Sequence, residues 1–162
     1  MIDTVIVRGA GDIATGTAHR LYKSGFRVVM TELEKPLTVR RTVSFASALL
    51  EGVSVVEGVR AFRAESFGDV LSIWHDGHIP VLCDRECRIA EYIKHLAVVD
   101  AIMAKRNTGT NRSMAPITIG VGPGFEAGLD VDAVVETNRG HNLGKVIWKG
   151  TAEANTGIRF CS

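Results

Sequence analysis

The 162-residue sequence has almost no net charge, no long hydrophobic run and few cysteines. Its 19 basic and 18 acidic side chains leave a formal charge of +1, so nothing favours binding to nucleic acid or to an anionic membrane surface. No apolar segment approaches the roughly 20 residues of a membrane span, and the first residues lack the charged and apolar regions of a signal peptide. The three cysteines show no disulfide-framework spacing. These absences together predict a cytoplasmic protein without a nucleic-acid or membrane partner.

What the sequence does contain is the composition of an ordinary folded domain. Hydrophobic residues make up 46% and charged residues 23%, near the globular average. The length suits a single domain with a real hydrophobic core, so we expect one domain over residues 1–162. The 17 glycines gather at 9–16, 120–128 and 140–144, which indicates positions with special backbone requirements.

Apolar segments of strand and helix type alternate along the chain, which predicts an α/β fold. The first unit is a buried strand over Thr4–Arg8, a helix over 12–24 ending at Gly25, and a second strand over 26–31. Further helices are expected over about 42–50, 66–75 and 85–96, with strands within 53–62, 79–84, 98–104, 117–121, 132–137 and 145–150. We therefore predict a Rossmann-like, mostly parallel sheet flanked by helices, with an antiparallel hairpin near the C-terminus.

The segment Gly9–Ala14, GAGDIA, fits the dinucleotide-binding fingerprint G-x-G-x-x-G/A. Gly9 would permit the tight turn after the strand, Gly11 would let a pyrophosphate approach the backbone, and Ala14 would keep the helix close to the sheet. The free amides at the helix start would then face the anion. The preceding strand and the following helix are the context that this fingerprint requires.

Residues around the turn add to this prediction and complicate it. Glu32 lies 21 positions after Gly11, where an acid can bind a ribose hydroxyl, and Arg40 could reach a phosphate or lie on a solvated helix start. Asp12 would repel a phosphate; we interpret it as the helix N-cap, although it could instead hold a nucleotide-bound magnesium ion. The expected cofactor-binding residues are Gly9, Ala10, Gly11, Asp12, Ile13, Ala14, Glu32 and Arg40.

Longer motifs connect the sequence with a known family. They are GAGDIATGTAHRL, TELEKPLTVRRTVSFA, DAIMAKRNTGT, GPGFEAGLDVDAVVETNRGHNLG and NTGI. Together they resemble the YqeB-type accessory proteins of selenium-dependent molybdenum hydroxylase systems, over nearly the whole chain. VRRTVSFA and ETNRGHNLG are specific, since ordinary Rossmann proteins do not carry them. The glycine turn is also similar to that of XdhC-type accessory proteins, which assist molybdenum-cofactor insertion.

Other candidate chemistry is weaker. Cys83 and Cys87 lack the C-x-x-C spacing, although a helix starting at Cys87 would stabilise a thiolate there. His141 lies in a polar, glycine-bounded loop that either binds a ligand or forms a hairpin turn. Lys105 and Asn107 belong to a long polar loop over 105–116 that would suit an anionic ligand. No metal-ligand set is evident, and no catalytic residue can be assigned.

The resemblance implies an accessory factor that helps to mature a molybdenum hydroxylase apo-enzyme. Its ligand would be NAD(P) or the nucleotide form of the molybdenum cofactor, bound at the first glycine turn. Two alternatives remain: an NAD(P)-dependent oxidoreductase, and a non-catalytic protein-interaction domain whose glycine turn is only structural. Whether the chain is an enzyme, and its oligomeric state, are left open by the sequence.

Overall fold

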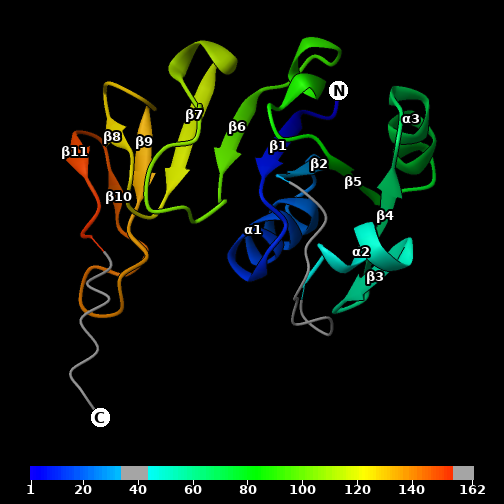
Figure 1. Cartoon of the computed structure of the whole chain (residues 1–162), viewed down its shortest axis with the longest axis horizontal. Helices are drawn as coiled ribbons and strands as arrows, with labels where there is room; N and C mark the ends of the chain where they lie inside the picture. Colours follow the sequence, from blue (N-terminus) through cyan, green and yellow to red (C-terminus); the bar gives the residue numbers. More distant parts are fainter. Residues whose placement is uncertain (34–43, 155–162) are drawn as a thin grey trace.

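The structure, a computed structural model, describes residues 1–33 and 44–154 and has the predicted Rossmann-like α/β fold (Figure 1). One sheet has the strand order β10-β9-β7-β6-β1-β2-β5-β4-β3, and β8 and β11 form a separate antiparallel pair. The strands are β1 (Thr4–Arg8), β2 (Arg27–Glu32), β3 (Val53–Val56), β4 (Val59–Ala64), β5 (Ile79–Cys83), β6 (Ala97–Asp100), β7 (Ile117–Val121), β8 (Glu126–Ala127), β9 (Ala133–Val135), β10 (Val146–Ile147) and β11 (Gly150–Thr151). The helices are α1 (Asp12–Lys23), α2 (Ser47–Glu51) and α3 (Phe67–His75), with short 3-10 turns η1 (Arg88–Glu91) and η2 (Arg112–Met114).

The central strands are buried on both faces, as parallel strands generally are. β1 is buried along its whole length and pairs in parallel with β2 on one side and β6 on the other. Val5 and Val7 pack in one core cluster with the small residues Ala14 and Ala18 of α1. Ile6, on the opposite face, packs in a second cluster with residues of α3. The alternation along β1 therefore places α1 and α3 on opposite sides of the sheet.

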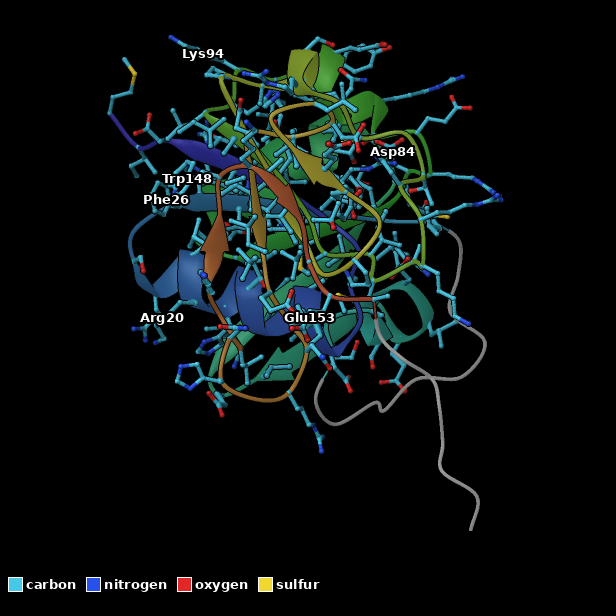
Figure 2. The ribbon with its side chains drawn as sticks, turned by 90° about the vertical axis from the view of Figure 1, so that its left-hand side faces the viewer. Arg20, Phe26, Asp84, Lys94, Trp148 and Glu153 are labelled. Atoms are coloured by element: carbon cyan, nitrogen blue, oxygen red, sulfur yellow. The ribbon has the colours of Figure 1, made fainter. Side chains whose placement is uncertain are left out.

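The far end of the sheet has a different covering layer. Among the described residues, no α-helix connects β6 to β7 or β7 to β9. The β8–β11 pair covers one face there, because Phe125 packs directly on Gly120 of β7. On the α1 side, Ile117 and Val146 are 41% and 46% exposed, and Trp148, just after β10, is 72% exposed (Figure 2). This end of the sheet therefore carries exposed apolar side chains that the central strands do not.

The antiparallel strands near the C-terminus are confirmed, since β9 and β10 pair antiparallel through Val135 and Val146. Residues 53–62 form the antiparallel pair β3–β4, whose turn residues Glu57 and Gly58 both have positive φ, as a tight hairpin requires. Among the described residues, no helix is long and apolar enough to cross a bilayer.

The predicted helix over 85–96 is wrong. Only the turn η1 forms, because the Asp84 carboxylate accepts hydrogen bonds from the amides of Arg88 and Ile89, at 2.9 Å each. The chain is then extended, and the Leu96 amide donates to the Thr4 carbonyl. The next residues form β6, which pairs with β1. The helix predicted over about 42–50 begins only at Ser47, and residues 42 and 43 lie outside the described ranges.

Candidate functional site

Gly9 ends β1 in a turn that no other residue fits well. Its φ is +102°, and a Cβ atom there would lie 2.9 Å from the Ala101 carbonyl oxygen. The Gly9 amide also donates to the Thr31 carbonyl at 2.6 Å, which ties the turn to β2. The first glycine of the fingerprint is therefore required by the packing of β1 against the segment after β6.

Gly11 has no such requirement. It is the N-cap of α1 with φ −73°, and among the described residues other than its chain neighbours, no heavy atom would lie within 4 Å of a Cβ placed there. The first amide paired along the helix is that of Thr15, which donates to the Gly11 carbonyl at 2.8 Å. The amides of Asp12, Ile13 and Ala14 belong to the turn in which a helix has no internal acceptors, and no other acceptor for them occurs in the described ranges. Open space and unpaired amides at a helix N-terminus are the properties of an anion site.

The interpretation of Asp12 as the N-cap is wrong. The cap is Gly11, whose extended backbone makes Asp12 the first helical residue, and no side chain caps α1. The Asp12 side chain is exposed, so it stabilises the helix through the helix dipole rather than through a capping hydrogen bond. Its negative charge stays next to the unpaired amides.

Glu32 reaches the glycine turn from the end of β2. Its Oε2 accepts a hydrogen bond from the Ala10 amide at 3.0 Å, and its Oε1 accepts one from the Leu33 amide at 2.8 Å. The structure thus brings the acid and the turn together, as the spacing predicted. A carboxylate can accept about four hydrogen bonds, so these two bonds orient Glu32 and leave it able to accept more. Arg40 lies outside the described residues.

A cluster of buried hydrogen bonds, which the sequence did not predict, holds the glycine turn in place. The Ala10 carbonyl accepts hydrogen bonds from the hydroxyls of Thr15 and Ser44, at 3.2 and 2.7 Å, and from the Ala46 amide at 2.9 Å. Thr15 also accepts from the Phe45 amide at 2.9 Å. Thr15 and Ser44 are buried, so the segment leading into α2 fixes the turn rigidly.

A buried network with charged side chains lies beside the glycine turn, and the sequence did not predict it either. Arg8, the last residue of β1, is 2% exposed and donates to the Thr110 hydroxyl at 2.7 Å and to the Arg85 carbonyl at 2.8 Å. Thr110 donates in turn to Asp100, the last residue of β6, at 2.6 Å. Asp100 accepts a second bond from the Ile102 amide. The network joins the ends of β1 and β6 to the loops that follow β5 and β6, at the carboxyl edge of the sheet where Rossmann-type ligands bind.

Cys87 cannot act as a thiolate in this environment. Burial raises the pKa of its thiol to about 11, and Arg8 only partly offsets this effect. The thiol is therefore protonated near neutral pH, and the thiolate expected from a helix start at Cys87 does not form. Cys83 is exposed.

The other polar loops named above lie within the described part of the chain. Asn107 donates to the Thr110 carbonyl and accepts from the amides of Gly109 and Thr110, so it shapes its own loop. Lys105 is exposed. His141 is exposed in the segment that joins β9 to β10, two strands that pair antiparallel as a hairpin. Within the described ranges, no group of three His, Cys, Asp or Glu residues could hold a metal ion.

Comparison with known proteins finds one long similarity. No family model and no solved structure matches the chain. The sequence is 53% identical over 154 residues to the "Uncharacterized protein YqeB" of Escherichia coli strain K12. The match covers 95% of this chain and 28% of that protein. The chain thus spans little more than a quarter of its relative's length, and it is similar to one part of YqeB.

Proposed function

We propose that this chain binds a nucleotide-containing ligand at Gly9–Ala14 and acts as an accessory factor in the maturation of a molybdenum hydroxylase. The ligand is a dinucleotide or the nucleotide form of the molybdenum cofactor. The observation that carries the proposal is the open space at Gly11 beside the unpaired amides of the first turn of α1. Packing does not require glycine at this position, and the unpaired backbone amides lie next to it. A ligand phosphate that approaches these amides closely would explain why the residue is glycine.

Each residue of the turn has a defined task in this proposal. The amides of Asp12, Ile13 and Ala14 would donate to a phosphate, and Glu32, oriented by its two backbone bonds, would accept from a ribose hydroxyl. The Asp12 carboxylate would repel a phosphate that binds to these amides without a screening cation. A bound magnesium ion would turn this repulsion into an attraction, since Mg²⁺ in nucleotide sites binds phosphates together with one or two carboxylates.

The link to molybdenum enzymes rests on the sequence motifs, not on the turn. VRRTVSFA and ETNRGHNLG resemble the YqeB-type accessory proteins, and the chain is 53% identical to part of YqeB. The partner in this proposal is the apo form of a molybdenum hydroxylase, which would receive the ligand that the chain holds. The chain's own residues bind and orient that ligand.

Calorimetric titration with NADH, NADPH, CTP and ATP, with and without magnesium, tests the binding step. We expect at least one of these compounds to bind the wild-type chain and to lose affinity by about tenfold or more in Gly11→Val, because the valine side chain fills the approach to the amides. The extended backbone of Gly11 accepts valine, so the fold should survive. Gly16→Ala, in the open space on the next turn of the helix, is the matched control and should bind normally.

This titration tests the interaction-domain alternative, and an assay of NADH formation tests the oxidoreductase alternative. No binding at millimolar ligand would contradict the nucleotide proposal and favour the non-catalytic interaction domain. Binding that is unaffected by Gly11→Val would remove the turn as the phosphate site. Stoichiometric NADH formation with a substrate would favour an oxidoreductase.

A further inference from the structure

Two adjoining cavities lie at the amino-terminal edge of the sheet, away from the glycine turn. Their volumes are about 220 and 200 Å³, and Ile2 and Arg27 line both. We propose that this edge binds a small aromatic anion, with its ring in the first cavity and its carboxylate or phosphate on Arg27. The proposal does not depend on the nucleotide site.

The first cavity has the lining of a ring-binding pocket. It is formed by Tyr22, Phe26, Trp74 and His78, together with the glycines that follow the C-terminal ends of α1 and α3. The Tyr22 hydroxyl donates to the Gly77 carbonyl at 2.6 Å, and the Trp74 indole donates to the Val28 carbonyl at 2.8 Å. Both rings are therefore held in position by their polar atoms, so the parts of the rings that line the cavity are fixed. An apolar cavity of about 150 Å³ already accommodates benzene, so one aromatic ring fits.

Arg27 supplies a pre-oriented anion-binding group between the two cavities. Its Nε donates to the Thr4 hydroxyl at 3.0 Å, and its guanidinium carbon lies 4.2 Å from the Trp74 ring centroid. The two terminal nitrogens have no acceptor among residues 1–33 and 44–154. A planar guanidinium fixed at Nε and by stacking presents those nitrogens as a fork for two oxygens of a carboxylate or phosphate.

The charges around Arg27 also favour an anion. The exposed side chain of Lys94 lines the second cavity and lies at the upper edge of the molecule in Figure 2. Asp3 is the acidic residue of that lining, and the described residues include no ion pair between Asp3 and Arg27. Within residues 1–33 and 44–154, the Arg27 guanidinium thus forms no ion pair with a carboxylate.

Size and position distinguish this ligand from a dinucleotide. Each cavity is smaller than the 300–1,000 Å³ of a typical cofactor or drug site, which restricts the ligand to one ring with one acidic group. Arg27 and Glu32 are the first and last residues of β2, five steps apart, a distance of roughly 17 Å at 3.3 Å per residue. A ligand here would leave the glycine turn untouched.

Phenyl phosphate is the test ligand, and Trp74 is the reporter. Trp148→Phe leaves Trp74 as the one tryptophan, so saturable quenching of its fluorescence measures binding. We expect Arg27→Gln to weaken phenyl phosphate binding by about tenfold or more, because charge-assisted hydrogen bonds are lost. Lys23→Gln removes a nearby exposed cation that lines neither cavity and should bind like the parent protein. Equal affinities of Arg27→Gln and Lys23→Gln would overturn the proposal, as would inorganic phosphate binding as tightly as phenyl phosphate.

A crystal of the wild-type chain soaked in 4-bromophenyl phosphate provides a readout that needs no variant. The proposal expects a bromine anomalous peak in the cavity beside Trp74, with the phosphate on Arg27. A peak at another place only, or no peak, contradicts it. Failure here while nucleotides still bind at Gly11 would remove this inference and leave the proposed function intact.

Discussion

Replacement of Arg8 tests how much of the stability depends on the buried network of Arg8, Thr110 and Asp100 beside the glycine turn. Arg8→Met keeps the length and apolar character of the stem but removes the guanidinium. Two hydrogen bonds are lost, to Thr110 and to the Arg85 carbonyl, and Asp100 stays 1% exposed without a cation 3.9 Å away. We therefore expect a large loss in the free energy of unfolding.

The magnitude follows from two opposing effects. Breaking a buried ion pair by removing one partner costs about 3–5 kcal/mol, because the other charge remains buried. The Arg8 Nε is itself buried without a partner among the described residues, and removal of this unsatisfied donor returns about 1 kcal/mol. The net loss is about 2–4 kcal/mol, a large share of the 5–15 kcal/mol that stabilises a typical domain.

Urea unfolding, followed by the fluorescence of Trp74 and Trp148, measures this loss. With an m value of about 2 kcal/mol/M, the midpoint should fall by about 1–2 M. Adding Asp100→Asn to Arg8→Met removes the uncompensated charge and should restore about 1 kcal/mol or more. Arg60→Met, at an exposed position of β4, is the control and should change stability by less than about 0.5 kcal/mol. A loss in Arg8→Met no larger than in this control would refute the reasoning.

Three further predictions concern the turn and the buried thiol. Gly9→Ala should cost about 2 kcal/mol or more in urea unfolding, because of its φ of +102° and its contact with the segment after β6, whereas Gly11→Ala should cost under about 0.5 kcal/mol; equal losses would contradict the assignment. Asp12→Asn should tighten nucleotide binding by about fivefold in magnesium-free, low-salt calorimetry, the effect of removing about 1 kcal/mol of repulsion; weaker binding would argue against repulsion. With a folded-state pKa raised from 9.0 to about 11, Cys87 should resist thiol reagents that label Cys83. Its contribution to stability should be full below pH 9 and be lost as pH rises through about 11, and a stability that increases over this range would be inconsistent with a buried thiol.

Much of the central fold could be predicted because local patterns and tertiary packing agree there. β1, α1 and β2 follow directly from an apolar run, a helical period and the glycines that bound them. The helix predicted over 85–96 failed because a side chain competes: Asp84 caps the first amides into a single turn, and the pairing of β6 with β1 then requires extended chain.

In the candidate site, too, some features could be predicted from the sequence and others could not. Spacing alone placed Glu32 at the glycine turn, since the ends of neighbouring parallel strands meet at one edge of the sheet. It could not place Ser44 beneath Ala10, because this hydrogen bond joins residues 34 positions apart and depends on the path of the intervening chain. It also misassigned the helix cap to Asp12, an error of one residue that only the backbone angles of Gly11 correct.

The sequence by itself determined the Rossmann-like class, the first βαβ unit and the residues of the glycine turn, because those depend on periodicity and on backbone freedom within a few residues. Only the tertiary structure decided at which position packing requires a glycine. Gly9 is confined by Ala101 of the neighbouring chain segment, whereas no described residue confines Gly11. It also decided the burial of Arg8 with Asp100 and the cavities around Arg27, which join residues from elements far apart in the chain. Burial, cavities and long-range hydrogen bonds depend on how elements pack, and no local pattern of residues contains that information.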